Sequence, residues 1–453
     1  MTTSPSIKSL YFLGIGGIGM SALARWFAAR GCRVEGYDRT PSPLTQQLEK
    51  EGIPIIYTDS PKEVADIPWT VVWTPAVPRD TALYQYFRSK GLPILKRAEM
   101  LGKVTHSMLA LCVAGTHGKT STATLLAHIL RPKGINAFLG GISMNEGSNL
   151  LTDPNSDTVV IEADEFDRSF LHLSPAISAI TAIDPDHLDI YGTSEGYQEG
   201  FEQYARLVKD AVVIKKGYHV AGNGKAKTYT YAVNEPADFY ADNVRVSDSK
   251  LLFNWHTLSC SLADVELGVP TYYDVENAVA AMAMAHLAGA DEKMLREGVR
   301  TYKGVWRRFN ILANTGRVTY IDDYAHHPKE LQTAISSTRL LYPQRHLIGI
   351  FQPHLFTRTR DFMDGFAAAL SQLDEVILLP IYPAREMPIE GVTSETLAQK
   401  INSMYPVRVV QKNDLTAYVC ERVRTCGEAT VMTLGAGDID RLTADLTANL
   451  TRL

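Results

Sequence analysis

The stretch Met108–Ser121, MLALCVAGTHGKTS, decides the fold of the middle of this chain. Its first seven residues are apolar without interruption, which is typical of a strand buried on both faces. The sequence Gly-Thr-His-Gly-Lys-Thr follows at once and leads into a segment with helical character. A buried strand, a glycine-rich loop and a helix together predict a phosphate-binding loop, because backbone N–H groups and the positive helix N-terminus can surround an anion.

This loop is shorter than the usual phosphate-binding loop but keeps its Gly-x-x-Gly-Lys-Thr core. Lys119 is expected to neutralise the β- and γ-phosphates of ATP, and the Thr120 hydroxyl is expected to ligate Mg²⁺. The alternative is a glycine-rich turn that binds nothing. The predicted ATP contacts are Gly115, Thr116, His117, Gly118, Lys119, Thr120 and Ser121.

Two acidic segments follow later apolar strands. EADEFD occupies residues 162–167, and DPDHLD occupies residues 184–189. In a doubly wound sheet the carboxyl ends of the strands share one edge, so both segments are expected beside the phosphate-binding loop. Carboxylates suit Mg²⁺, and a histidine is a less usual ligand. The alternative is a pair of solvated acidic loops.

The N-terminal region begins with a predicted strand at Ser9–Leu13, followed by Gly-Ile-Gly-Gly-Ile-Gly at residues 14–19 and by Asp38 after the next strand. By rule this arrangement is a dinucleotide site for NAD. Physically it indicates only that a diphosphate can approach a helix N-terminus, and a nucleotide sugar carries a diphosphate too. The pattern alone does not choose between them.

The last third of the chain carries three groups of polar residues at expected strand ends. They are Arg307-Arg308, DDYAHHP at residues 322–328 and FQPHLFTR at residues 351–358. The planar guanidinium of arginine suits phosphate or carboxylate binding. The alternatives are a solvated arginine pair and a simple turn at the histidines before Pro328.

Alternating strands and helices predict an α/β protein of three domains with mostly parallel sheets. Domain boundaries are expected near residue 107 and between residues 310 and 314. The 453 residues carry a net charge of −5 and no run of Lys and Arg, so no nucleic-acid partner is expected. No stretch of 18 apolar residues predicts a membrane span. The five scattered cysteines favour a reducing compartment, and we expect a cytoplasmic monomer or homodimer.

Taken in order, GTHGKTST, EADEFD, DHLD-x-YG, RRF, DDYAHHP and FQPHLFTRTR resemble the Mur ligase family over residues 8–440. The set, together with GIGGIGM near the N-terminus, is most similar to the branch that adds L-alanine to UDP-N-acetylmuramate. The resemblance implies a Rossmann-like UDP-sugar domain at residues 1–107, a P-loop ATPase domain at 108–312 and a Rossmann-like amino-acid domain at 313–453.

The resemblance also implies a reaction. ATP would phosphorylate the lactyl carboxylate of UDP-N-acetylmuramate, and the amine of L-alanine would attack the acyl phosphate, as a step of peptidoglycan precursor synthesis. Lys119, His187 and Arg308 would be catalytic, and Thr120, Glu165 and His187 would hold Mg²⁺. Asn277 would contact adenine, and Asp323 the ribose of ATP. The implied UDP-sugar contacts are Gly16, Gly17, Ile18, Gly19, Thr74 and Ala76, and the implied alanine contacts are Tyr324, His326, His354 and Arg358.

Two departures from the family pattern stand out. The family's His-Asn-x-x-Asn is Tyr-Asp-Val-Glu-Asn at residues 273–277, and Phe201 occupies the place of a carbamylated lysine found in several members. The alternatives among enzymes are a recycling ligase that attaches a whole tripeptide and a folylpolyglutamate synthetase-like ligase. The alternative from a different class is an NAD-binding regulatory protein with a vestigial ATPase.

Overall fold

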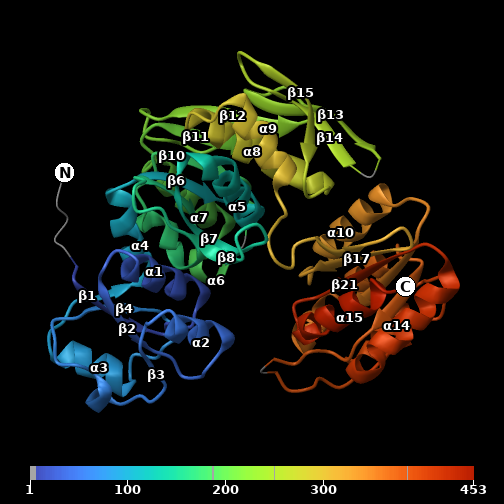
Figure 1. Ribbon diagram of the computed structural model, residues 1–453, viewed down its shortest axis with the longest axis horizontal. Coiled ribbons are helices and arrows are strands. Elements are labelled where there is room, and N and C mark those ends of the chain that lie inside the picture. The colour runs from blue at the N-terminus through green and yellow to red at the C-terminus, as the bar shows by residue number, and fades with distance from the viewer. Residues whose placement is uncertain (1–6, 186–187, 249, 385) are drawn as a thin grey trace. The chain divides into compact units, whose positions relative to one another are not determined.

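Three sheets with helices on their faces form the computed structural model, which describes residues 7–185, 188–248, 250–384 and 386–453 (Figure 1). The described chain packs into two compact units. The first comprises Met1–Asn243, Phe253–Val265 and Glu276–Tyr302, and the second comprises Val244–Leu252, Glu266–Val275 and Lys303–Leu453. No helix among the described residues is long and apolar enough to cross a membrane.

The first sheet is parallel and has the strand order β3-β2-β1-β4-β5, which matches five of the six strands of a dinucleotide-binding fold. Its central strand β1 is buried on both faces, because Leu10 and Phe12 enter one core cluster while Tyr11 and Leu13 enter another. The elements are β1 (Ser9–Leu13), α1 (Ile18–Ala28), β2 (Arg33–Tyr37), α2 (Pro43–Lys50), β3 (Ile55–Ile56), β4 (Thr70–Trp73), α3 (Ala82–Ser89), β5 (Ile94–Lys96) and α4 (Arg97–His106).

The second sheet has ten strands in the order β15-β14-β13-β12-β11-β10-β6-β9-β7-β8. Its parallel centre was predicted from the buried strands around the phosphate-binding loop. Its elements are β6 (Leu109–Ala114), α5 (Lys119–Leu130), β7 (Asn136–Ser143), β8 (Ser148–Leu151), β9 (Thr158–Glu162), β10 (Ile177–Ile180), α6 (Leu188–Tyr191), α7 (Ser194–Ala205), β11 (Ala211–Lys215), β12 (Lys227–Val233), β13 (Phe239–Ser247), β14 (Lys250–His256), β15 (Ser261–Leu267), α8 (Tyr272–Leu287) and α9 (Glu292–Thr301).

The third sheet has the order β16-β17-β21-β18-β19-β20, and only the β16–β17 pair is antiparallel. The last strand of the chain, β21, lies between β17 and β18, so the order differs from that of the first sheet. The elements are β16 (Asn310–Asn314), β17 (Val318–Asp323), α10 (Pro328–Leu341), β18 (His346–Phe351), α11 (Phe356–Asp361), α12 (Met363–Leu370), β19 (Glu375–Leu378), α13 (Ser394–Lys400), β20 (Arg408–Val409), α14 (Lys412–Cys426), β21 (Ala429–Leu434) and α15 (Thr443–Leu450).

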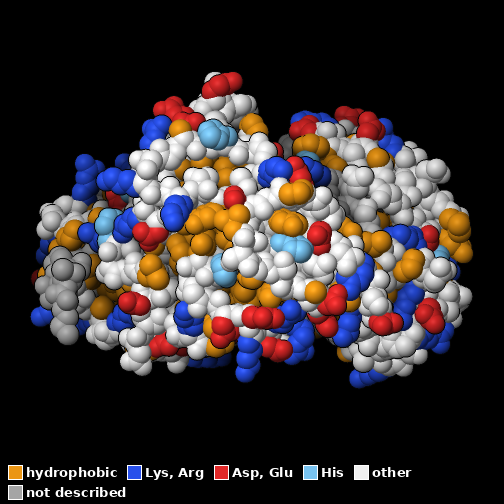
Figure 2. All heavy atoms as spheres, turned by 90° about the horizontal axis from the view of Figure 1, so that it is seen from above, with side chains coloured by type: hydrophobic (Ala, Val, Ile, Leu, Met, Phe, Trp, Pro, Cys, Tyr) orange, Lys and Arg blue, Asp and Glu red, His pale blue; other side chains and the backbone are white. Residues whose placement is uncertain are grey.

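The prediction of an α/β protein with three sheets of mainly parallel strands is confirmed. One detail differs at the second expected boundary. Residues 310–314 form β16, which pairs with β17, so this segment already belongs to the third sheet. Charged side chains of both signs lie interspersed on the face drawn in Figure 2.

Candidate functional site

The phosphate-binding loop follows the end of β6, as the sequence predicts. Gly115 and Gly118 have φ values of +135° and +77°, a region that other residues rarely adopt, and Gly118 is the residue that precedes α5. Strands β9 and β10 run parallel to β6 on either side. The carboxyl ends of these three strands therefore meet at one edge, which holds the loop, the EADEFD segment and Asp184.

The side chain of Lys119 contacts both the start of this loop and the EADEFD segment. Its ammonium donates to the Gly115 carbonyl at 2.6 Å and lies 2.7 Å from Oε2 of Glu165. The Glu165 side chain is only 2% exposed. Burial raises the pKa of Glu165, and the charge of Lys119 opposes that shift. The structure thus pairs Glu165, which the sequence analysis names as a metal ligand, with the phosphate-binding lysine.

A second carboxylate reaches Thr120. Glu162, the last residue of β9, accepts a hydrogen bond from the Gly140 amide at 3.0 Å, and the Thr120 side chain lies near enough to favour its charged form. Burial raises the pKa of Glu162, while Thr120 and the charge of Lys119 oppose the shift. EADEFD was predicted to lie beside the loop, but no role was predicted for its first residue. The signal available in the sequence was the position of Glu162 at the end of a strand, at the sheet edge that holds the phosphate-binding loop.

The other residues of the loop contact neighbouring strands and helices. Thr116 donates to the carbonyl of Asp184 at 2.8 Å, and the His117 ring lies 3.7 Å from the Asp184 carboxylate. Asn277, on α8, accepts from the Thr122 hydroxyl at 3.2 Å and lies against Gly118. Asn277 is therefore beside the loop, and Ser121 follows Thr120 in the first turn of α5. The predicted ligand His187 lies outside the described residues.

The N-terminal glycine loop connects β1 to α1. Gly17 precedes the first helical residue, Ile18, whose side chain is exposed, and a side chain at Gly14 would collide with Thr74. The loop and Thr74 are therefore neighbours, and Ala76 is exposed close by in the sequence. The Asp38 carboxylate accepts the Gly16 N–H at 2.7 Å. Asp38 thus holds the loop itself, which is a different use from the ribose contact of an NAD site.

An arginine that the sequence analysis did not single out lies at this loop. Arg97 begins α4, and its guanidinium would be 2.9 Å from a side chain placed at Gly19. Its ion pair with Asp164 is long, at 3.9 Å, and its side chain is 30% exposed. A guanidinium next to a helix N-terminus adds positive potential where an anion would sit.

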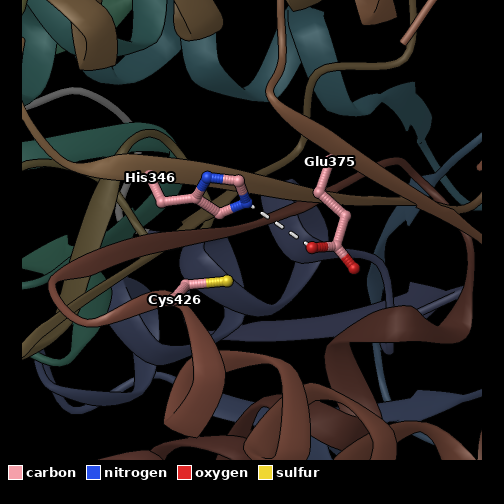
Figure 3. A group of neighbouring side chains, drawn as sticks. All are labelled: His346, Glu375 and Cys426. Carbon is pink, nitrogen blue, oxygen red and sulfur yellow. Dashed lines mark ion pairs between the residues drawn. The ribbon is translucent and has the colours of Figure 1, made fainter. Parts of the chain in front are cut away.

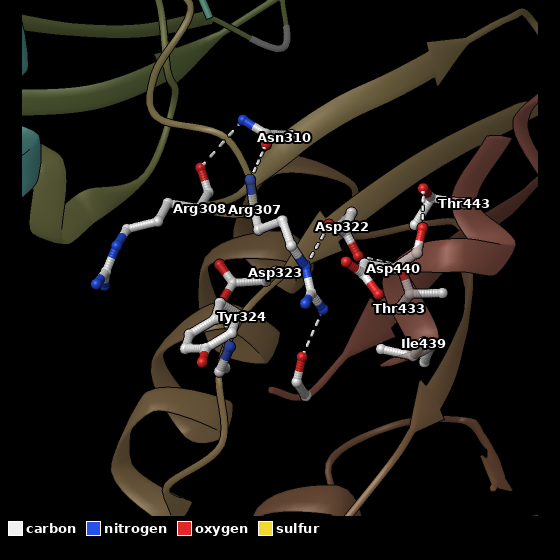
Figure 4. Close-up of polar contacts among 12 residues, drawn as sticks. Arg307, Arg308, Asn310, Asp322, Asp323, Tyr324, Thr433, Ile439, Asp440 and Thr443 are labelled. Atoms are coloured by element: carbon white, nitrogen blue, oxygen red, sulfur yellow. Dashed lines mark hydrogen bonds and ion pairs between the residues drawn. The ribbon is translucent and has the colours of Figure 1, made fainter. Parts of the chain in front are cut away.

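In the third sheet the two adjacent arginines have different environments. Arg307 is buried, lies 3.3 Å from the Asp322 carboxylate and points toward it, while the Arg308 side chain points away and is exposed (Figure 4). Asp323 accepts the backbone N–H of Phe309 at 2.9 Å and of Ala325 at 2.7 Å. Burial raises the pKa of Asp323 to about 7. One carboxylate oxygen of Asp323 therefore holds the loop that precedes β16, and the other holds the loop that follows β17.

The four predicted alanine contacts gather at the ends of β17 and β18. The ring of His326 packs edge-on against Tyr324 at 5.1 Å, and its Nδ1 lies 3.0 Å from the Tyr324 carbonyl oxygen. Burial lowers the pKa of both His326 and His354, and the charge of Arg358 lowers both further. Because the charge of Arg358 lowers the pKa of both rings, Arg358 lies near both His326 and His354.

A loop after β19 supports this group and was not predicted. The Tyr382 ring stacks on His354 with centroids 5.6 Å apart, and the Tyr382 carbonyl accepts the Leu355 N–H at 2.9 Å. Glu386 accepts the N–H of Thr357 at 3.0 Å and also its hydroxyl. Leu355 between them has a φ of +68°. The loop therefore fixes the turn that carries His354 and Arg358.

A separate cluster joins His346, Glu375 and Cys426, whose ligand atoms lie within 4.8 Å of one another (Figure 3). His346 and Glu375 begin β18 and β19, so the cluster lies at the amino ends of the strands, away from the residues above. Arg422 forms two hydrogen bonds with Glu375, at 2.7 and 3.0 Å. Its guanidinium already neutralises the carboxylate and would repel a cation, so we assign this cluster to stability.

Comparison with known proteins gives a consistent result along the chain. Family models described as "Mur ligase family, catalytic domain", "Mur ligase middle domain" and "Mur ligase, glutamate ligase domain" match residues 9–107, 113–285 and 307–439. The UDP-N-acetylmuramate–L-alanine ligase of Porphyromonas gingivalis is 51% identical over 96% of this chain and 97% of its own length. That of Flavobacterium johnsoniae is 44% identical over 96% of each chain.

Solved structures agree in fold. The crystal structure of UDP-N-acetylmuramate-alanine ligase MurC from Thermotoga maritima has a TM-score of 0.81 and 27% identity, covering 98% of this chain and 99% of its own. A murein peptide ligase from Psychrobacter arcticus has a TM-score of 0.66 and 22% identity, covering 98% and 99%. The second likeness concerns the fold alone.

Proposed function

We propose that this chain, which belongs to the Mur ligase family, is an ATP-dependent ligase that joins L-alanine to the lactyl carboxylate of UDP-N-acetylmuramate in peptidoglycan precursor synthesis. Three family models cover most of its length. The observation that carries the proposal is the 51% identity to a UDP-N-acetylmuramate–L-alanine ligase over nearly the whole of both chains.

The chemistry explains why a phosphate-binding loop is needed. A carboxylate is a poor electrophile at neutral pH, and phosphorylation by ATP supplies a leaving group. The carboxylate and the γ-phosphate are both anionic, so cations must neutralise them as they approach. Lys119 would bind the phosphates and leave its contact with Glu165 on doing so, and Arg308, exposed beside a buried arginine, would contribute a further positive charge.

Mg²⁺ fits the donors at this edge of the sheet, because the Thr120 hydroxyl and the Glu162 carboxylate lie near each other and Glu165 lies next to Lys119. Thr120, Glu165 and His187 are the ligands that the family resemblance implies, and we add Glu162 to them. The ion would supply charge neutralisation and orientation of the phosphate oxygens. Asn277 would contact the adenine, and Asp323 would order the loops next to the ribose.

The UDP-sugar would bind to loops that follow strands of the first sheet. Its diphosphate would lie at Gly16–Gly19 and its nucleotide near Thr74 and Ala76. Arg97 adds a cation next to Gly19. Asp38 is engaged with Gly16, which favours a nucleotide sugar over NAD at this loop. Residues 1–107 would bind the sugar and residues 108–309 would bind ATP, and the amino-acid domain would begin with β16 at residue 310 instead of at residue 313.

L-alanine would bind to the residues at the ends of β17 and β18. Arg358 would hold its carboxylate by a two-pronged contact, and Tyr324, His326 and His354 would surround the amine and methyl group. L-alanine needs only a small pocket, because its side chain is a methyl group. All five cysteines are free, which supports a reducing compartment and hence the cytoplasm, where the enzyme would act as a monomer or homodimer.

Phosphate release tests this function. Purified protein with ATP, Mg²⁺ and UDP-N-acetylmuramate should release phosphate when L-alanine is added, and less with other single amino acids. An L-Ala-γ-D-Glu-meso-diaminopimelate tripeptide is the comparison that separates the recycling ligase. Activity with the tripeptide in place of alanine would reassign the substrate, and no phosphate release with either would refute the ligase function.

A further inference from the structure

Two adjacent histidines precede helix α10, and the structure uses their rings differently. Nδ1 of His326 lies 3.0 Å from the Tyr324 carbonyl oxygen and 3.5 Å from the Glu330 carboxylate. Both oxygens can only accept hydrogen bonds, so Nδ1 of His326 carries the proton. In a neutral imidazole the other nitrogen, Nε2, then keeps its lone pair free to accept a proton.

His327 has the opposite arrangement. Its Nδ1 accepts the Lys329 N–H at 3.4 Å as the cap of α10, so its lone pair is on Nδ1 and its proton is on Nε2. The neighbouring ring is therefore committed to holding the helix. Only His326 of this pair presents a basic nitrogen away from the backbone.

The amino group of an amino acid is an ammonium ion at neutral pH and has no lone pair with which to attack a carbonyl carbon. Amide formation therefore needs a group that accepts its proton. We propose that Nε2 of His326 is the general base that deprotonates the incoming L-alanine. This inference rests on the proposed ligase function and assigns His326 a role beyond contact with the amino acid.

The orientation of the ring supports this role. A general base works best when another group fixes its tautomer and direction, and here the Tyr324 carbonyl does so from the same loop. The Tyr324 ring packs edge-on against the imidazole and limits its rotation. The His326 side chain is 25% exposed, so the nitrogen is sheltered but accessible to a small molecule.

Charged groups around the ring keep it ready to accept a proton. Burial lowers the pKa of His326, and the positive charges of Arg358 and Arg308 lower it further, while Glu330 and the Tyr324 carbonyl act in the opposite direction. His354 and the Tyr324 phenol are further titratable neighbours of the ring. The imidazole is therefore neutral at neutral pH, as a base must be before reaction.

The proton balance is simple. The ammonium gives one proton to Nε2, and the free amine attacks the acyl carbon as the bond from that carbon to the phosphate oxygen breaks. The nitrogen loses its second proton to the departing phosphate, which leaves as hydrogen phosphate. The protonated His326 then returns its proton to water, and no oxidant or further reactant is needed.

The test measures phosphate release by the full chain with two amine substrates, L-alanine and β-fluoro-L-alanine. It compares variants of His326 with a variant of His327. His326→Gln keeps a polar group near Nε2 but is not basic. Its kcat/KM for L-alanine at pH 7 should fall by about 10²–10⁴-fold, the usual contribution of a general base. The loss should shrink at alkaline pH, and it should be smaller for β-fluoro-L-alanine, because fluorine makes the amine less basic and leaves more of it unprotonated.

His327→Gln is the matched control and should retain the wild-type pH profile, with a small loss of thermal stability from the weaker cap. An equal loss for both amines with an unchanged pH profile would make His326 a contact residue and overturn the inference. His326→Asn, which can still donate to the Tyr324 carbonyl, repeats the test if the glutamine variant unfolds. Absence of phosphate release by the wild type would instead refute the ligase function itself.

Discussion

The ammonium of Lys119 lies 2.7 Å from the carboxylate of Glu165, inside the loop that should receive the phosphates of ATP. Each group needs the other in the absence of nucleotide, because Glu165 is almost fully buried. Nucleotide binding must therefore exchange one partner of Lys119 for another.

Lys119→Ala should abolish phosphate release, because the phosphates lose their point charge. It should also lower the free energy of unfolding by about 3–5 kcal/mol, the usual cost of leaving one member of a buried ion pair alone. Thermal denaturation checks the second effect. A double variant with Glu165→Gln should recover most of the stability but no activity, and recovery of activity would contradict the role of Lys119.

Glu162→Gln should raise the Mg²⁺ concentration needed for half-maximal activity by more than Glu165→Gln does. Glu162 lies near Thr120, whereas Glu165 accepts a hydrogen bond from Lys119. A titration of phosphate release against Mg²⁺ in both variants decides between them. A larger effect at Glu165 would favour the assignment made from the sequence alone.

Arg97→Ala should raise the KM for UDP-N-acetylmuramate by roughly tenfold, which corresponds to about 1.4 kcal/mol for a lost charged contact. The KM values for ATP and L-alanine should stay near those of the wild type. Arg33→Ala is a suitable control, because Arg33 is an exposed residue of the same sheet paired with Glu35. An unchanged KM for the UDP-sugar would remove Arg97 from the binding site.

Arg358→Lys should raise the KM for L-alanine and lower kcat, since lysine keeps the charge but loses the planar fork that orients a carboxylate. The KM for ATP should change little. Initial rates over a grid of both substrates measure the two effects. Equal weakening of ATP and alanine would place Arg358 at the phosphates.

The stability of the third sheet should depend on pH through Asp323. Burial raises its pKa to about 7, above the value near 4 of an exposed aspartate. The folded state therefore binds more protons between these values, and stability should fall as pH rises from about 4 to about 7. Denaturant unfolding across this range should show a smaller fall in Asp323→Asn. An unchanged slope would contradict the contribution of Asp323.

The sequence predicted the residues whose chemistry depends on local pattern. A buried strand, glycines at fixed spacing and a following helix place Lys119 and Thr120 without any tertiary information, and the structure has this order. The choice between Glu162 and Glu165 could not be made that way. Both stand in one acidic run, and only the packing of the side chains decides which one meets Thr120 and which one meets Lys119.

The contributions of Tyr382 and Glu386 were missed for a related reason. They act on the turn at residues 354–357 through stacking and hydrogen bonds from another loop, across about 30 residues of sequence. The two adjacent arginines show the same limit, because the turn before β16 directs Arg307 inward to Asp322 and leaves Arg308 exposed. The order of residues along the chain does not show which of the two arginine side chains points inward.

The position of β21 bears on how the chain is made. Residues 429–434 join β17 to β18, the two strands whose ends carry His326 and Arg358. The ribosome makes β21 only after β17 and β18, the two strands that it joins, so the third sheet cannot close before residues 429–434 have been made. A premature stop shortly before residue 429 would leave the first two sheets intact in sequence while removing the strand that unites the amino-acid site.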